Sequence, residues 1–273
     1  MRTFAVFNQY TTIMEKVIVT GSDGFIGSSL AKRLTRIGYQ VIGIDRKSGH
    51  DITELAGLLR AGGIKCVFHL AAQTSVFNND CQQIMKDNID AFYYVCDLCK
   101  MYDVKLVYAS SSTAEPCNTT SLYGISKRFD ERYAAIYNRK ATGVRLHNVY
   151  GANPRPGTLL HTLLNNERVT LYNNGENIRC FTYIDDIVEG LIMAAYSDEQ
   201  LLNCVNNEPM TIRKFAETVQ LIQIGNGRKM TILDIVPTKR DKDNVEQVVN
   251  NSIRTIELNY RSVDEGLKLA LDE

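Results

Sequence analysis

The chain has 273 residues, which is enough for one large α/β unit or two closely packed lobes. Its 31 Lys and Arg balance its 31 Asp and Glu, so the charge predicts neither a nucleic acid nor an anionic membrane as a partner. The seven Cys are scattered and odd in number, which is typical of free thiols in a reducing compartment. No apolar run reaches the ~18 residues of a membrane span, and we expect a cytoplasmic protein.

Residues 1–14 precede the first predicted strand and are interpreted as an N-terminal extension, with an apolar patch too short for a signal peptide. From residue 15 to residue 150, β-branched apolar runs alternate with amphipathic helical patterns. The predicted strands cover 16–20, 40–44, 65–70, 105–110 and 143–149. The predicted helices cover the stretch from Phe25 to Gly38, and then 52–62, 80–101 and 122–140.

This alternation predicts an α/β fold in which a doubly wound parallel sheet of the Rossmann type carries helices on both faces. We assign this dinucleotide-binding domain to residues 15–150. After residue 151 the pattern is less regular. Residues 151–273 are expected to form a smaller C-terminal α/β substrate lobe, packed on the first and interleaved with it. In this lobe, short strands at 168–172, 202–206 and 230–236 mix with helices at 158–165, 185–197, 211–223 and 263–271.

The first predicted strand runs into a glycine-rich turn. Gly21, Gly24 and Gly27 have the spacing G-x-x-G-x-x-G and open the first helix. Glycine at such positions permits a tight turn and a close approach of the backbone to a phosphate, and the helix N-terminus offers free N–H groups. Together with Phe25 and Ile26, which begin the helix, these glycines are predicted to bind a dinucleotide.

The second predicted strand ends at Asp45. A carboxylate there would bind both ribose hydroxyls of the adenosine half and would repel a 2′-phosphate, so NAD is favoured over NADP. Arg46 and Lys47 follow and weaken that preference, and Arg46 is included among the cofactor residues. Asp51 and Ile52 are assigned to the adenine side.

The stretch 110–127 holds a run of hydroxyls followed by Tyr123 and Lys127, four residues apart. On a helix this spacing puts the two side chains on one face, one turn apart. A cation that close favours the phenolate, so Tyr123 could take a proton from a sugar or alcohol hydroxyl. Lys127 could also bind the nicotinamide ribose, and Ser111 could hydrogen-bond the same substrate oxygen as Tyr123. Alone, the pattern occurs on many solvated helices; behind a nucleotide-binding turn, it indicates a proton-transfer site.

In its motifs the chain resembles the extended short-chain dehydrogenase/reductases, the NAD-dependent sugar-nucleotide epimerases and dehydratases, and within them the UDP-glucose and UDP-glucuronate 4-epimerases most. The resemblance covers nearly all of 16–271. It rests on the segments VTGSDGFIG, VFHLAAQTSV, DNIDA, VYASSST, YGISK, RLHNVYG and GENIRCFTYIDDIVEGL. It implies NAD as the cofactor, a nucleotide sugar as the substrate, and a homodimer formed through the helices at 80–101 and 122–140.

The resemblance also assigns residues by position. Tyr123 would be the catalytic base, Lys127 its partner and Ser111 the third catalytic residue. The cofactor would also be contacted by His69, Leu70, Ala71, Ala72, Asn88, Ser110, Tyr123 and Lys127. The substrate would be bound by Thr74, Ser111, Ser112, Asn148, Arg179 and Arg240. The last three would contact the diphosphate, for which Arg guanidinium groups are suited.

Three features depart from the family pattern. The segment between Ser111 and Tyr123 is short, with Ala-Glu-Pro at 114–116 where relatives have a longer loop beginning Val-Tyr-Gly. We therefore expect a sugar pocket that is more open or differently shaped. Cys180 replaces an Asp that is common after the Arg, and the compact C-terminal lobe is expected to reduce recognition of the base.

Several chemistries remain open. A redox-neutral 4-epimerase that works through a 4-keto sugar comes first. A 4-keto-sugar-nucleotide reductase using NADH or NADPH would need the same three residues. A 4,6-dehydratase is disfavoured, because it needs Asp-Glu after the catalytic hydroxyl, where this chain has Ser112 and Thr113. A dinucleotide-binding protein without catalysis is the alternative from another class, and only the short loop supports it.

Other conspicuous residues are given structural roles. Cys96 and Cys99 form a CxxC without a second Cys pair or a nearby His, so we interpret them as small apolar residues on one helix face. Asp185 is expected to cap the helix that follows it. The histidines at positions 50, 147 and 161 are assigned to structure or surface, and no metal site is predicted.

Overall fold

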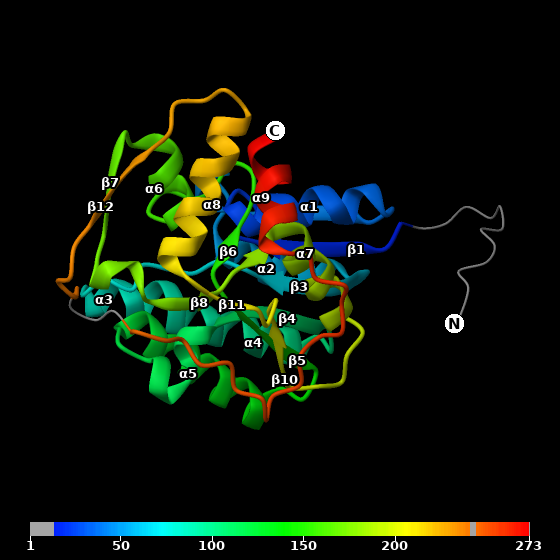
Figure 1. Cartoon of the computed structure of the whole chain (residues 1–273). Helices are drawn as coiled ribbons and strands as arrows, with labels where there is room; N and C mark the ends of the chain where they lie inside the picture. The colour runs from blue at the N-terminus through cyan, green and yellow to red at the C-terminus, as the bar shows by residue number, and fades with distance from the viewer. Residues whose placement is uncertain (1–13, 241–243, 273) are drawn as a thin grey trace.

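The computed structural model describes residues 14–240 and 244–272. The extension predicted at 1–14 therefore lies, except for Met14, outside the described residues, and β1 begins at Lys16. Figure 1 shows a central sheet with helices on both faces and a second group of helices and short strands beside it.

A six-stranded parallel sheet forms the centre, in the order β10-β5-β4-β3-β1-β2. This confirms the predicted doubly wound parallel sheet of the Rossmann type. The strand predicted at 202–206 and assigned to the second lobe is β10, so the chain returns to the central sheet after residue 151. The strands are β1 (Lys16–Thr20), β2 (Gln40–Ile44), β3 (Ile64–His69), β4 (Lys105–Ser111), β5 (Ala141–Leu146) and β10 (Leu201–Cys204).

Alternate residues of the central strands face opposite sides of the sheet. Val17 and Val19 of β1 belong to an apolar cluster with helices α1 and α7. Ile18, between them, belongs to a cluster with α2, α4 and α5 on the other side. Burial of these apolar faces holds the helices on the sheet. The helices are α1 (Phe25–Arg36), α2 (Leu55–Ala61), α4 (Ala91–Met101), α5 (Leu122–Tyr137) and α7 (Ile184–Ala194).

The long helix predicted at 80–101 forms, but its winding changes along its length. It consists of α3 (Cys81–Ile84), a π-helical segment η3 (Met85–Asp90) and α4. Asn88 is the buried residue of the π-helical segment. Such segments occur frequently at functional sites, where the extra residue per turn re-aims a side chain.

A third apolar cluster forms the core of the smaller lobe. Phe181 stacks on Phe215 with ring centroids 4.0 Å apart, and Tyr150 packs edge-on against Phe215. The helices around these rings are α6 (Leu159–Asn165), α8 (Ile212–Gly225) and α9 (Val263–Asp272). The short strands pair as β6 (Val149–Tyr150) with β9 (Thr182–Tyr183), β7 (Arg168–Leu171) with β12 (Ile232–Ile235), and β8 (Ile178–Cys180) with β11 (Pro209–Thr211).

An irregular segment between β12 and α9, residues 244–256, connects the smaller lobe with the edge of the central sheet. We call it the crossing segment, and Figure 1 draws it in orange to red. It starts beside β8, where Ile178 N donates to Val245 O at 2.7 Å. It ends beside β10, where Asn203 N donates to Arg254 O at 2.9 Å. The crossing segment is therefore anchored in both lobes.

Two structural roles predicted from the sequence have different outcomes. Cys96 and Cys99 lie in α4 and are fully buried, as predicted. The prediction that Asp185 caps a helix is wrong. Tyr183 is the N-cap of α7, and Asp185 lies inside the first turn, where its charge suits the helix dipole.

Within residues 14–240 and 244–272, no helix is long and apolar enough to cross a membrane.

Candidate active site

Close backbone packing holds the glycine-rich turn after β1. Gly21 has a φ of +73°, a conformation that favours glycine, and a Cβ there would lie 2.8 Å from Ala71 N. A Cβ on Gly27 would lie only 2.0 Å from Gly21 O. Gly24 is the N-cap of α1, whose first turn holds no acidic residue. The free N–H groups of that turn and its positive dipole end make the loop suitable for a phosphate.

Asp45 lies at the end of β2, beside this turn. Its Oδ2 accepts a hydrogen bond from Asp23 N at 3.0 Å, and its Oδ1 accepts one from Lys47 N at 2.9 Å. Arg46 is paired with Asp87 at 3.2 Å, and this hydrogen bond raises its pKa. The carboxylate is thus fixed next to the glycine turn, while the neighbouring guanidinium is engaged by the π-helical segment.

The residues after β3 lie against the same turn. Leu70 N donates to Thr20 O at 3.0 Å, and Ala71 N donates to Thr20 Oγ1 at 3.4 Å. The Thr20 hydroxyl also lies 2.8 Å from His69 Nδ1. Burial, with a smaller effect of Lys127, lowers the pKa of His69 to about 3, so this imidazole is neutral.

Asn88 connects the loop after β3 with the helix that carries Tyr123. Its Oδ1 accepts from Gln73 N at 2.8 Å, and its Nδ2 donates to Gln73 O at 3.0 Å and to Ser126 Oγ at 2.9 Å. The π-helical segment therefore serves to set the position of this loop relative to α5. Of the two residues predicted on the adenine side, Asp51 caps the short helix η2 (Ile52–Glu54), which begins at the second, Ile52.

Tyr123 and Lys127 lie one turn apart on α5, which Ser121 caps by accepting from Gly124 N. Lys127 is only 3% exposed, and its Nζ donates to Asp130 Oδ2 at 3.1 Å. Burial alone would lower the pKa of Lys127, but Asp130 and then Tyr123 outweigh this effect and raise it. The lysine is therefore an ammonium ion next to the phenol. Within the part of the chain that the structure describes, no hydrogen bond engages the Tyr123 hydroxyl.

Asp130, which the sequence analysis did not single out, lies behind Lys127 and is fully buried. Burial raises the pKa of Asp130 to about 7, against the attraction of Lys127. Its second oxygen, Oδ1, has no hydrogen-bond partner among the described residues. An acid three residues after a lysine is typical of a surface ion pair on a helix, so the local pattern does not indicate that this pair is buried.

The hydroxyl run lies at the end of β4, against the first turn of α5. A Cβ on Gly124 would lie 2.6 Å from Thr113 O, so helix and run are in close contact. Ser111 is 8% exposed, and its Oγ accepts from Thr113 N at 3.2 Å and from Thr113 Oγ1 at 2.9 Å. Thr113 thus links Ser111 to the first turn of α5, which carries Tyr123.

A buried ionic network underlies this run. Ser110 Oγ donates to Glu131 at 2.6 Å, and Glu131 accepts two bonds from Arg145, at 2.7 and 2.8 Å. Arg145 also pairs with Glu115 from the short loop. Ser110 therefore connects the end of β4 to this buried network.

Two of the residues predicted to bind the substrate, Ser112 and Asn148, contact a residue that was not predicted from the sequence. Gln247 Oε1, in the crossing segment, accepts from Asn148 Nδ2 at 2.8 Å and from Ser112 Oγ at 3.5 Å. Asn148 also donates to Cys180 O at 3.3 Å, and Arg179 is buried beside the crossing segment. No local pattern marks Gln247, because its two partners precede it by about a hundred residues or more.

Two further arginines lie over the loop after β3. Arg240 is exposed and lies over the rings of Tyr172, at 5.0 Å, and Phe77, at 5.6 Å. Arg155, which was not predicted, donates to Thr74 Oγ1. Cationic side chains from the smaller lobe thus reach the loop that carries Thr74.

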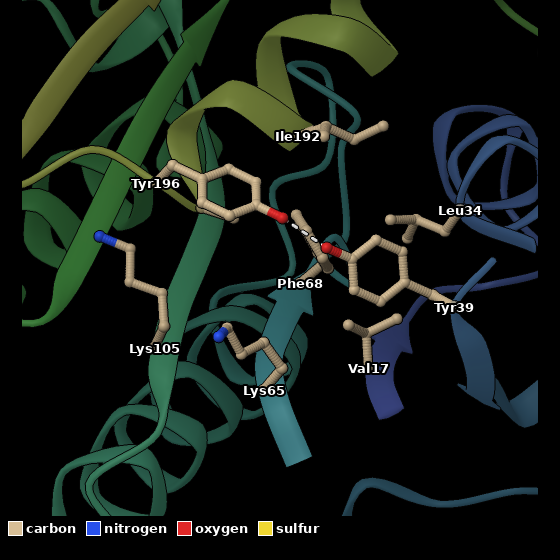
Figure 2. Close-up of a pocket in the computed structure, with 9 residues that line it drawn as sticks. Val17, Leu34, Tyr39, Lys65, Phe68, Lys105, Ile192 and Tyr196 are labelled. Atoms are coloured by element: carbon tan, nitrogen blue, oxygen red, sulfur yellow. Dashed lines mark hydrogen bonds between the residues drawn. The ribbon is translucent and has the colours of Figure 1, made fainter. Parts of the chain in front are cut away.

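A cavity of about 50 Å³ lies near the amino-terminal ends of the central strands, between α1 and α7. Figure 2 shows Val17, Lys65 and Lys105 on its walls, and the hydroxyls of Tyr39 and Tyr196 hydrogen-bonded to each other. Val17, Lys65 and Lys105 lie near the amino-terminal ends of β1, β3 and β4, whereas the glycine turn follows the carboxyl-terminal end of β1 and the hydroxyl run lies at that of β4. The cavity has room for a few water molecules and is separate from the candidate active site.

The chain belongs to the NAD dependent epimerase/dehydratase family, whose model matches residues 17–204. The protein CapI of Staphylococcus aureus is 26% identical, over 81% of this chain and 87% of that protein. UDP-glucuronate 4-epimerase 4 of Arabidopsis thaliana is 28% identical, over 81% of this chain and 62% of that protein. A solved structure of MoeE5 in complex with UDP-glucuronic acid and NAD is 25% identical, covers 94% of this chain and 98% of that chain, and has a TM-score of 0.77.

These similarities confirm the predicted family, the NAD-dependent enzymes of the extended short-chain dehydrogenase/reductase type, and NAD as the cofactor. The described residues fit this cofactor. The glycine turn admits no Cβ at positions 21 and 27, and the carboxylate of Asp45 is fixed beside it. Like Tyr123, both lie beyond the carboxyl-terminal ends of the parallel strands, where sheets of this kind bind their ligands.

Proposed function

We propose that the protein is an NAD-dependent 4-epimerase of a UDP-hexose or a UDP-hexuronate that works through a 4-keto sugar. One observation carries the proposal: Tyr123 lies on the first turn of α5, with the ammonium of Lys127 one turn away and Ser111 at the adjoining strand end. This arrangement is suited to moving a proton on and off a sugar hydroxyl.

Each of the three residues has a role that its surroundings allow. Tyr123 removes the proton of the sugar 4-hydroxyl and later returns it, with the ammonium of Lys127 one helix turn away. Ser111 donates a hydrogen bond to the same sugar oxygen. NAD, when bound, supplies the acceptor and donor of the hydride at C4. The 4-keto sugar must turn over between the two transfers, so the pocket must hold the diphosphate firmly and the ring loosely.

The rest of the site divides between cofactor and substrate. Gly21, Gly24 and the N-terminus of α1 would hold the NAD pyrophosphate, and Asp45 would bind the adenosine ribose. The diphosphate of the sugar nucleotide would be bound by Asn148, Arg179 and Arg240. The position of Asn148 beside the buried Arg179 supports this division.

The test is an assay of the purified protein with UDP-glucose and UDP-glucuronate, with separation of the products. We expect interconversion of the 4-epimers without net reduction of NAD. Tyr123→Phe should lower kcat by about 10²- to 10⁴-fold, the usual contribution of a general base, while NAD stays bound. Tyr133→Phe, on the same helix, is the matched control and should remain active.

Other outcomes would favour the alternatives. Consumption of NADH with a 4-keto sugar nucleotide, without epimerisation of UDP-glucose, would establish a reductase instead. If the wild type and Tyr123→Phe were equally inert across a broad panel of sugar nucleotides, the proposal of an enzyme would be wrong, and a binding protein without catalysis would remain.

We also propose a homodimer formed through α4 and α5. Their outer faces expose Tyr93 (50%), Ile125 (55%), Phe129 (38%) and Ile136 (86%). Phe129 stacks on Tyr133 at 5.7 Å, and Tyr93 packs edge-on against the same ring. A second copy of the chain would cover this apolar stripe, which is unusual for a surface facing water.

A further inference from the structure

Asn118, in the short loop between the hydroxyl run and α5, is the residue on which the crossing segment docks. It is 1% exposed. Its Nδ2 donates to Val248 O at 2.8 Å and its Oδ1 accepts from Val248 N at 3.0 Å, so the side-chain amide pairs with a backbone as a neighbouring strand would. The same Nδ2 donates to Ser112 O at 3.1 Å. One buried amide thus binds the hydroxyl run and the crossing segment together.

Neighbouring contacts make this a built junction. Asn244 Nδ2 donates to Asn118 O at 2.9 Å, and Asn250 Nδ2 donates to Glu115 Oε2 at 2.8 Å. These bonds lie on either side of Val248 in the sequence, so the short loop holds residues 244–250 along their length.

The residue just before Val248 is Gln247, whose side chain contacts Ser112 and Asn148. A shift of the backbone at Val248 would therefore move the Gln247 amide directly. Since Gln247 reaches the substrate side only from the crossing segment, its position depends on the bonds that Asn118 makes.

We propose that Asn118 is a positioning residue for substrate binding. It fixes the crossing segment as a wall of the sugar-nucleotide site and places Gln247 between Ser112 and Asn148, without itself touching the substrate. The inference rests on the proposed function, because it takes a UDP-sugar as the ligand. It also accounts for the short loop: residues 112–121 are a docking surface for the chain's own crossing segment.

The test removes one hydrogen bond of this junction by a substitution in the crossing segment, so that Asn118 itself is unchanged. Val248→Pro eliminates the backbone N–H that donates a hydrogen bond to Asn118 Oδ1. Val248→Ala keeps this N–H and is the matched control, since Val248 is 46% exposed. The NAD-loaded proteins are titrated with UDP-glucose, UDP-glucuronate and UDP by calorimetry, and NAD affinity and Tm are measured in parallel. We expect Val248→Pro to bind its UDP ligand about tenfold more weakly than Val248→Ala, roughly the effect of one lost hydrogen bond, with NAD affinity unchanged. Asn118→Ala should behave in the same way.

A double-mutant cycle separates positioning from plain destabilisation. If Asn118 acts through Gln247, Val248→Pro should have little further effect on binding in a Gln247→Ala background. Equal binding by Val248→Pro and Val248→Ala, or additive effects in the cycle, would overturn the inference even if Tm falls. A wild type that binds none of the three ligands would overturn the proposed function, and the inference with it.

Discussion

The two halves of the candidate active site, which we call the nucleotide half and the reacting half after their proposed roles, differ in the groups that form them. The nucleotide half consists of glycines, backbone amides and one surface carboxylate, and its parts follow one another within the first strands and helix. The reacting half consists of buried charged and polar side chains: Lys127, Asp130, Glu131 and Arg145 are each at most 8% exposed. Its parts come from β4, α5, β5 and the crossing segment.

The difference teaches what each half tolerates. The nucleotide half tolerates no added volume, since a methyl group added at Gly21 or Gly27 would overlap with backbone atoms. Charge balance determines the reacting half, since a buried ion that loses its partner is strongly destabilising. We therefore expect substitutions that add volume to impair the nucleotide half independently of pH. Substitutions that change a charge should impair the reacting half to an extent that depends on pH.

The largest effect is expected from Gly27→Ala. The new Cβ would lie 2.0 Å from Gly21 O and 2.8 Å from Gly21 C, so the turn must open. We expect NAD binding to be lost by calorimetry and the free energy of unfolding to fall by about 1–3 kcal/mol, as for other overpacked sites. Gly57→Ala is the matched control, because a Cβ there would meet no atom of the described residues within 4 Å and Ala favours the helix α2. A Gly27→Ala protein that binds NAD normally would contradict the steric account.

The nucleotide half was predictable because its information is local. A strand, a turn that only glycine can form and a helix start lie next to one another, and each of the three has its own sequence pattern. For the same reason the central strands and the helices on them were predicted to within a few residues. The sheet partner of the strand at 202–206 was not, since a short apolar run carries no mark of which neighbour it pairs with.

The reacting half was predictable only where it also is local. Tyr123 and Lys127 share a helix, and Ser111 ends a strand just before it. Gln247 and Asn118 could not be found, because their roles come from hydrogen bonds between segments about 130 residues apart. Asn and Gln are ordinary surface residues in a sequence, and these two are distinguished only by their hydrogen bonds to distant segments and, for Asn118, by burial.

The next effect tests the charge balance. Asp130 has a folded pKa of about 7, above the value of about 3.9 in an unfolded chain. The folded protein therefore binds more protons than the unfolded one between about pH 4 and pH 7, and Asp130 lowers the stability as the pH rises through this window. Asp130→Asn removes that loss. Relative to the wild type, the free energy of unfolding of the mutant should therefore rise by about 2–3 kcal/mol from pH 5 to pH 8, as for a single group with these two pKa values.

The measurement is denaturant unfolding of both proteins at pH 5, 6, 7 and 8. The groups that face Asp130 are Lys127 and Glu131 on its own helix, Tyr108 on β4 and Cys96 on α4. The pKa values of the lysine, the phenol and the thiol are all raised, to above this window. The four histidines are present in both proteins, so their contributions cancel in the difference. A difference in the free energy of unfolding between mutant and wild type that stays constant across the four pH values would refute a buried Asp130 that titrates near neutrality.

The smallest effect on the chemistry is expected at the surface of α5, outside both halves. Ile136 is 86% exposed, and with Ile125 and Phe129 it continues the apolar stripe of the proposed dimer. Ile136→Glu places a charge in that interface, where a like charge of the second copy would face it or water would have to remain. We expect light scattering after gel filtration to show a dimer for the wild type and a shift toward monomer for the mutant, with epimerisation per chain within about twofold, since a surface change far from the site alters stability little. Leu221→Glu on α8, where Leu221 is 66% exposed, is the matched control and should stay dimeric. A monomeric wild type, or equal masses for both mutants, would contradict a dimer interface on α5. The apolar stripe would then have to bind a different partner.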